Sequence, residues 1–321
     1  MSTSTPIDFP CSTGNQVGSS YTLSNGSVTL EPSGLVVLNG TLYMASDNGY
    51  LASMDVSSGA SLNQSWTQVH DFTNDSGYEG DSNSYDLESI TTATGKLMVG
   101  VEGKAGTNGS NAYDPHIFRY DTANDDTTSS IWDITDVTLG SAGGMEAMTF
   151  VPGSACPPQT INGQPNPAYY GGDQYYGGYF FAAYQSKTGY VYVYDLPKGD
   201  NDTHTVGSHL QKFEITDGNG AMISMEASDM CFANGYLFIL FDGGGNGAKD
   251  EIHLFSIRSD GSGLDHAGAS YLPVFENVWE EQTDFEGLTI DGSNLYLSVD
   301  AASPNFKLVY QFTDYSISKF V

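Results

Sequence analysis

Five residues with oxygen-bearing side chains stand at the heads of five similar segments of this 321-residue chain. In each segment the head residue is followed by a short apolar run, a turn and a second apolar run. Carboxylate and hydroxyl oxygens are ligands for hard cations, and Ca²⁺ takes roughly six to eight such oxygens in a flexible geometry. The head residues are Ser33, Glu88, Glu146, Ser228 and Glu286.

The regular spacing of these segments indicates an internal repeat. They cover residues 33–47, 88–102, 146–185, 228–242 and 286–300. Successive heads lie about 55 to 60 residues apart, with one longer interval, and such a period is typical of repeat architectures. The longer interval contains residues 154–176, which are rich in Pro, Gly and Tyr and are interpreted as an inserted loop.

Further strand-like runs follow each pair of apolar runs. They are residues 50–56 and 66–72, 116–121 and 130–135, 190–196 and 210–216, 251–257 and 273–279, and the single run 307–313. Five units of four strands predict an all-β fold, a five-bladed β-propeller formed by one domain over residues 1–321. The N-terminal segment 19–30 is expected to supply the missing strand and close the ring, which removes an exposed sheet edge. A β-sandwich with a second domain explains the five copies less well.

The propeller fold brings the five head residues together, because the first strand of each blade lines the central channel. At ~4 Å and an effective dielectric of about 20, each pair of converging carboxylates repels by about 4 kcal/mol. Protonation would relieve this repulsion, and so would a bound cation. A ligand set without His or Cys favours Ca²⁺ over Mg²⁺. Two alternatives stay open: solvent-facing acids without a metal, and a register in which Glu31 and Glu226 replace Ser33 and Ser228.

A second polar ring is expected at the channel mouth, because the second strand of each blade runs back to the same face. The strand ends carry Asp47, Glu102, Gln185, Asp242 and Asp300. Gly-rich loops at 102–116 and 242–251 extend beyond this ring, and such loops on a rigid scaffold often bind ligands. They also fit plain connections between strands.

The charge of the chain excludes some classes of partner. It has 39 acidic against 10 basic residues and a formal net charge of −29. Nucleic-acid polymers and anionic membrane surfaces need clustered Lys and Arg, so neither is expected as a partner. The sequence contains no apolar run of about 18 residues that would span a membrane.

Several features favour an extracellular protein. The first residues lack the basic start and apolar middle of a signal peptide, so we expect a mature, secreted form. Six glycosylation sequons fit a glycoprotein: Asn25, Asn39, Asn63, Asn74, Asn108 and Asn201. Of the three cysteines, Cys231 is expected to be a buried free thiol, and an extracellular protein could bridge Cys11 to Cys156.

The order Ser, Glu, Glu, Ser, Glu over five inner strands resembles the calcium-activated nucleotidases, or soluble apyrases. The segment "LEPSGLVVLNGTLYMASDNG" (30–49) is similar to the first-blade motif of that family, and "DFEGLTI" (284–290) is similar to its last. "DFEGLTID" equally resembles the propellers described as "esterase-like activity of phytase". The nucleotidase resemblance implies a secreted propeller with one central Ca²⁺ held by the five head residues.

The sequence departs from the nucleotidase pattern where phosphate would bind. Asn48 stands where that family has Arg, and Lys104 alone matches a basic position. Phosphoryl transfer needs positive charge around the phosphate oxygens, so this provision is thin.

Three functions therefore stay open, and whether the protein is an enzyme is undecided. The first is a Ca²⁺-dependent hydrolase of small phosphoesters or phosphoanhydrides, assisted by Lys104. The second is a non-catalytic extracellular module that binds glycans or itself, with a structural Ca²⁺. The third is a carbohydrate-active enzyme that uses two mouth acids, for instance Asp47 with Asp300.

Overall fold

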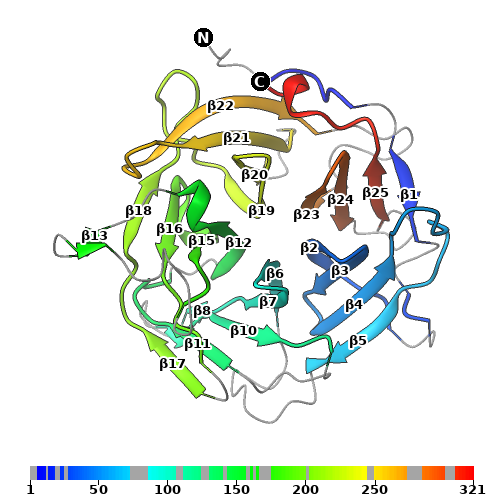
Figure 1. Cartoon of the computed structure of the whole chain (residues 1–321), viewed down its shortest axis with the longest axis horizontal. Helices are drawn as coiled ribbons and strands as arrows, with labels where there is room; N and C mark the ends of the chain where they lie inside the picture. The colour runs from blue at the N-terminus through cyan, green and yellow to red at the C-terminus, as the bar shows by residue number, and fades with distance from the viewer. Residues whose placement is uncertain are drawn as a thin grey trace.

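The computed structural model forms a closed ring of five β-sheets around a central axis (Figure 1). It describes residues 6–11, 14–18, 22–24, 28–72, 86–105, 111–123, 130–139, 143–156, 160–161, 164–165, 175–199, 202–243, 249–272, 284–300 and 308–321. The predicted five-bladed propeller is therefore confirmed. Among these residues, no helix has the length and apolar character needed to cross a membrane.

Each blade is built on four antiparallel strands, which lie side by side from the axis outward. Blade 1 has β2 (Pro32–Leu38), β3 (Thr41–Ser46), β4 (Tyr50–Asp55) and β5 (Thr67–Asp71). Blade 2 has β6 (Leu87–Ala93), β7 (Lys96–Val101), β10 (His116–Tyr120) and β11 (Ser130–Ile134). Blade 3 has β12 (Met145–Pro152), β15 (Gly178–Tyr184), β16 (Tyr190–Tyr194) and β18 (Gln211–Glu214).

Blade 4 has β19 (Glu226–Ala233), β20 (Tyr236–Asp242), β21 (Glu251–Ile257) and β22 (Leu264–Tyr271). Blade 5 has β23 (Asp284–Asp291), β24 (Asn294–Asp300), β25 (Leu308–Phe312) and β1 (Asn15–Val17). Two short hairpins lie outside the blades: β8 (Lys104–Ala105) with β9 (Asn111–Tyr113), and β13 (Thr160–Ile161) with β14 (Gln164–Pro165). The second hairpin lies in the predicted insertion 154–176.

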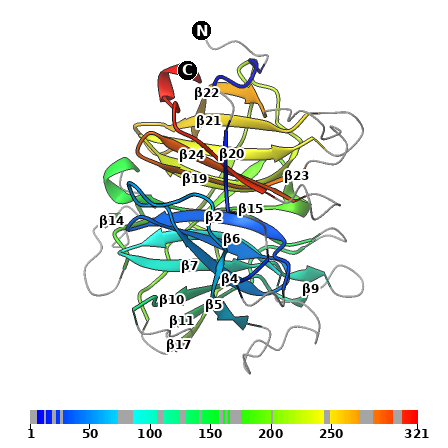
Figure 2. The same ribbon diagram turned by 90° about the vertical axis from the view of Figure 1, so that its right-hand side faces the viewer.

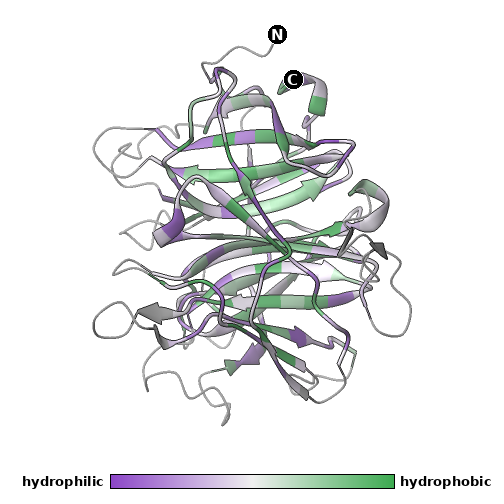
Figure 3. Cartoon of the chain, turned by 90° about the vertical axis from the view of Figure 1, so that its left-hand side faces the viewer, coloured by the Kyte–Doolittle hydropathy of each residue, from purple (hydrophilic) through white to green (hydrophobic). Residues whose placement is uncertain are grey.

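The hydrophobic cores lie between neighbouring blades. One core combines Phe181 and Phe213 of blade 3 with Phe241 and Phe255 of blade 4. Inner strands are packed on both faces, and all seven residues of β15 are buried. In Figure 3 the hydrophobic colouring follows the stacked strands. This two-sided burial explains why the inner pairs read as near-continuous apolar runs.

An N-terminal strand closes the ring, but it is not the segment that the sequence predicted. Strand β1 pairs antiparallel with β25, so residues 15–17 complete blade 5. The described residues of the expected segment 19–30 lie elsewhere: Leu23 and Leu30 are buried in the core between blades 1 and 5, and Leu23 bridges Trp66. Both chain ends then cover blades 4 and 5, where Ile7 bridges Ser270 of β22 (Figure 2).

One other expectation was wrong. The fourth strand of blade 4 is β22, not residues 273–279, which lie outside the described part of the chain. All three cysteines are free, so Cys231 is a free thiol as expected, although it is only partly buried, and the Cys11–Cys156 bridge that the sequence left open does not form. Cys156 is buried between blades 3 and 4, whereas Cys11 packs on the core of blades 4 and 5.

An unpredicted strand ties blade 2 to blade 3. Strand β17 (Asp202–Val206) lies in sequence between two strands of blade 3, yet it pairs in parallel with β11 of blade 2. The indole of Trp132 donates a hydrogen bond to the Pro197 carbonyl (3.0 Å) and stacks on His204. Blade 2 therefore has a fifth, outermost strand.

Candidate metal centre at the propeller axis

Every blade has a β-bulge at the same position of its innermost strand. In all five inner pairs the register shifts by one residue there, which leaves one residue without a cross-strand partner. Bulges bend a strand and re-aim a side chain, and they often occur next to functional sites. The five unpaired residues are Ser33, Glu88, Glu146, Ser228 and Glu286.

The structure thus brings the five predicted head residues to equivalent positions around the axis. Glu31 and Glu226, the alternative candidates, lie two residues before the bulges of their blades, and the charge of Glu226 still acts on Glu146. Ser33, Glu146 and Ser228 are buried.

The carboxyl groups of this ring act on one another across several blades. Burial raises the pKa of Glu88 well above its usual range, and the charges of Glu146, Asp47, Asp86 and Glu286 raise it further. These four acids come from blades 3, 1, 2 and 5. Convergence of the acids was expected, and the charges around Glu88 show that it occurs.

The pKa of Glu146 is also raised well above its usual range. Burial is the largest cause of its raised pKa, followed by the charges of Glu102 and Glu226. A hydrogen bond with Glu102 acts in the same direction, because the neutral form of one carboxyl donates to the other. The seam between blades 2 and 3 thus holds two carboxyl groups in direct contact.

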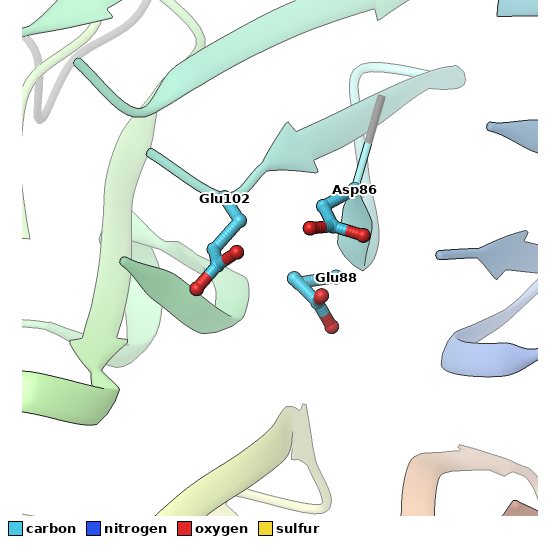
Figure 4. A group of neighbouring side chains, drawn as sticks. All are labelled: Asp86, Glu88 and Glu102. Carbon is cyan, nitrogen blue, oxygen red and sulfur yellow. The ribbon is translucent and has the colours of Figure 1, made fainter. Parts of the chain in front are cut away.

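A compact group of three acids lies on blade 2. Asp86, Glu88 and Glu102 each offer a carboxylate oxygen, and these oxygens all lie within 4.8 Å of one another. Figure 4 shows the three side chains around a common space. Sequence reasoning did not select Asp86, although it stands two residues before a head residue, as do Glu31 and Glu226.

Two glycines of blade 3 support the Glu102 carboxylate. The Gly144 amide donates a hydrogen bond to Oε1 of Glu102 (2.7 Å). A Cβ atom added to Gly143 would lie 1.6 Å from the same oxygen, so no larger residue fits there without displacing the carboxylate. The Gly-Gly pair before β12 thus forms a cradle for an acid of the neighbouring blade.

The expected members of the second polar ring lie at or next to the ends of the second strands. Backbone amides of its members donate to carbonyls two residues before the bulges, as in Asp47 to Glu31 (2.9 Å) and Glu102 to Asp86 (2.8 Å). The Ser33 hydroxyl donates to Oδ1 of Asp47, which links the two rings. The other members are Gln185, Asp242 and Asp300.

The proposed catalytic residues are only partly defined by the structure. Lys104 lies in β8 and Asp300 ends β24, but their side chains are outside the described part of the chain. Asn48 accepts a hydrogen bond from Ser46 (2.7 Å) and donates one to the Thr29 carbonyl (2.7 Å). Where the nucleotidase pattern has Arg, this chain therefore uses the side chain to fix a turn.

The donor set at the axis fits a hard divalent cation. The candidate ligands are carboxylate and hydroxyl oxygens, and burial together with neighbouring carboxyl charges raises the pKa values of Glu88 and Glu146. The glycine cradle holds Glu102 in place before any ion binds. Fold and site together define a five-bladed propeller with a buried acidic centre on its axis.

Comparison with known proteins identifies the family. The family model "Phytase-like: Esterase-like activity of phytase" matches residues 31–300, and the chain belongs to this family. The match extends from the start of blade 1 to the end of β24. No curated protein matches the chain.

Among solved structures, the GH43 endo-arabinanase from Bacillus licheniformis is similar at 12% identity and a TM-score of 0.48, over 88% of this chain and 92% of that one. The glutaminyl cyclase from Myxococcus xanthus is similar at 11% identity and a TM-score of 0.34, over 66% and 61%. The computationally designed Ika4 protein is similar at 9% identity and a TM-score of 0.31, over 75% and 98%. Similarity this distant says nothing about substrate.

Proposed function

We propose that the chain binds Ca²⁺ at the propeller axis and is a Ca²⁺-dependent hydrolase of small phosphoesters or phosphoanhydrides. The observation that carries the proposal is the set of five aligned bulges, which put three carboxylates and two hydroxyls at equivalent positions of the five inner strands. The family description, which names an esterase-like activity, supports ester hydrolysis.

In this proposal the ring residues hold the ion. Glu88, Glu146 and Glu286 would supply carboxylate oxygens, and Ser33 and Ser228 hydroxyl oxygens. A bound Ca²⁺ would neutralise their repulsion and polarise a phosphoryl oxygen. Asp86 and Glu102 surround Glu88 and would hold its carboxylate toward the axis by repulsion from their own charges.

The mouth residues would handle protons and the substrate. Asp47 and Asp300 are the proposed acceptors of a proton from water, and Asp47 already accepts the Ser33 hydroxyl. Lys104 is the proposed cationic contact with the phosphate. The Gly144 amide, which donates a hydrogen bond to Glu102, would help to hold this acid at the seam between blades 2 and 3.

One observation favours a second candidate function, a non-catalytic binding module with a structural Ca²⁺. The charges that raise the pKa of Glu88 and of Glu146 all come from other carboxyl groups. A polyphosphate entering this mouth would meet Asp47, Glu102 and Asp242. A neutral glycan or a second copy of the chain avoids that repulsion. A carbohydrate-active enzyme using Asp47 and Asp300 is the third candidate.

Phosphate release from nucleoside di- and triphosphates and from small phosphomonoesters, with Ca²⁺ and with chelator, tests the proposal. We expect Ca²⁺-dependent turnover that Glu88→Gln abolishes, whereas Asp260→Asn, at an exposed turn, leaves it unchanged. No turnover, with a melting temperature that still falls on chelation, would support the binding module. No effect of Ca²⁺ on either quantity would refute the metal site.

We also propose that the protein acts outside the cell. Asn39 and Asn63 are the sequon residues in the described part of the chain, and both are exposed. Mass spectrometry of the protein from its native source should find N-glycans at these two positions. Fully unmodified peptides would argue against passage through a glycosylating secretory route.

A further inference from the structure

One position of the inner strands carries an acid where the other blades carry small residues. The residue directly after each bulge is Gly34, Ser89, Ala147, Asp229 and Gly287 in blades 1 to 5. Space is tight there: a Cβ added to Gly34 would lie 2.8 Å from the Ile90 amide nitrogen. At Gly287 it would lie 2.9 Å from the Leu35 side chain. Four small residues therefore let the inner strands approach closely, and only blade 4 places a carboxylate among them.

The carboxylate of Asp229 is fully buried and accepts hydrogen bonds from three blades. The Met230 amide of its own strand donates to Oδ1 (2.8 Å), and the Leu288 amide of blade 5 donates to Oδ2 (2.7 Å). The Leu35 amide of blade 1 is the third donor. These amides are equivalent, because each follows the bulge of its own strand by two residues.

Such an arrangement ties three inner strands to one buried group. Burial raises the pKa of Asp229, and the three backbone hydrogen bonds act in the opposite direction, because they favour the charged form. Loss of the acceptor would leave three buried amides without a partner, and each such amide destabilises the fold. The three strands that Asp229 joins carry Ser33, Ser228 and Glu286.

We propose that Asp229 is a positioning residue for the axial cation site. Its carboxylate does not touch the ion in this proposal. It keeps the bulges of blades 1, 4 and 5 at the same level along the axis, so that Ser33, Ser228 and Glu286 point to the axis together. This role rests on the proposed function where it concerns Ca²⁺, whereas the effect on the three strands is independent of Ca²⁺.

Other inner strands are tied by a different contact, and this supplies a matched control. The Thr91 hydroxyl of blade 2 accepts a hydrogen bond from the Phe150 amide of blade 3 (3.1 Å). Thr149 of blade 3 likewise accepts one from the Phe232 amide of blade 4 (3.2 Å). Thr91→Val removes one buried contact between blades, with little change of shape, and does not involve Asp229.

The experiment compares the wild-type chain with Asp229→Asn and Thr91→Val by amide hydrogen exchange without Ca²⁺. The amide group of Asn has one acceptor and would turn a donor toward one of the three backbone amides. We expect faster exchange in residues 31–38, 226–233 and 284–291 of Asp229→Asn, with residues 87–93 unchanged. Thr91→Val should instead affect blades 2 and 3. Exchange that rises uniformly in all five blades of Asp229→Asn would overturn the proposal.

Calorimetric titration with Ca²⁺ gives the second readout. Residues that orient metal ligands typically change affinity by about 10–100-fold, so Asp229→Asn should weaken Ca²⁺ binding by at least about tenfold. Thr91→Val should bind as the wild type does. Unchanged affinity in Asp229→Asn, while Glu88→Gln loses binding, would overturn the positioning role and leave the metal site intact.

The two proposals fail separately. If the wild-type chain binds no Ca²⁺, the proposed function fails, and the exchange pattern alone decides whether Asp229 organises the three strands. If Asp229→Asn does not fold, Asp229→Ser keeps one oxygen acceptor in a smaller side chain and takes its place. The same two outcomes of exchange and titration then decide.

Discussion

The carboxyl groups of Glu146 and Glu102 share a hydrogen bond across the seam between blades 2 and 3. Two acids in contact and largely removed from water cannot both be ionised without cost. The contact between these acids therefore opposes folding. Conflicts between local charge and the overall fold are expected at functional or strained sites, and this one motivates the proposed cation site.

Glu146→Gln should stabilise the protein in chelator. The amide keeps a hydrogen-bond donor toward Glu102 and removes a buried ionisable group whose charged form is unfavourable, so we expect the melting temperature to rise by at least about 2 °C. With Ca²⁺ present the order should reverse, because the variant has lost a proposed ligand. Thermal unfolding in both conditions measures the two effects. A variant less stable than the wild type in chelator would contradict this account of the ring.

Asp250→Asn should stabilise the protein at neutral and alkaline pH. Burial and the charge of Asp242 raise the pKa of Asp250 from 3.8 to about 6. A raised pKa in the folded state means that stability falls as pH rises from about 4 to about 6, and then stays constant. Because one pKa unit corresponds to about 1.4 kcal/mol, removing the charge should raise the free energy of unfolding by about 3 kcal/mol at pH 8.

Comparing the stability of Asp250→Asn with that of the wild type at low and at high pH provides the control for this prediction. The Asn oxygen can still accept the hydrogen bond that the Gly243 amide donates to Asp250 (3.0 Å). Below pH 4 the wild-type carboxyl is neutral, so variant and wild type should unfold at the same denaturant concentration. A difference between them that is constant from pH 4 to pH 8 would rule out the charge as its cause.

The sequence predicts well the inner strands and the positions of the head residues in them, and the reason is physical. Inner strands are buried on both faces and repeat five times, so their apolar runs and head residues align. Outer strand β22 contains Gly268, Ala267 and His266, and lacks such a signal. Strand β1 has three residues, too few to show any period. The position of β17 in blade 2 depends on tertiary packing alone.

Asp229 shows where sequence reasoning ends. In "SDMCF" it reads as an ordinary polar interruption of an apolar run, because nothing local indicates the amides of Leu35 and Leu288. Asp86 could have been found, since it repeats the spacing of Glu31 and Glu226 before their bulges. An alignment of the inner strands of all five blades would have revealed Asp86, but it would not have revealed the role of Asp229.

His266 should make the protein less stable in acid. Nε2 of His266 lies 3.1 Å from Nδ1 of His253. Nε2 of His253 lies 2.7 Å from a carboxylate oxygen of Glu251. Nδ1 of His266 is buried without a hydrogen-bond partner. Burial lowers the pKa of His266, and the charge of His253 lowers it further, while Asp217 acts in the opposite direction.

A histidine with a lowered pKa in the folded state costs stability as pH falls through the unfolded value of 6.5. His266→Gln removes the titration, so the variant should lose less stability than the wild type between pH 7 and pH 5. Chemical denaturation at these two pH values measures the difference.

Phe320→Ala should destabilise the ring at its closure. Phe320 is buried, and its ring lies 6.2 Å from that of Phe9, 5.8 Å from Tyr315 and 6.4 Å from Phe238 of blade 4. The two chain ends thus meet over blades 4 and 5, where the ring of blades closes without a covalent link.

Loss of a buried Phe side chain typically costs about 3–5 kcal/mol. We expect a loss of about 3 kcal/mol in the free energy of unfolding, whereas Val321→Ala, at an exposed position, should change it by less than about 0.5 kcal/mol. Equal effects of the two variants would show that the C-terminal segment does not secure the closure, and the pairing of β1 with β25 would then have to hold the ring alone.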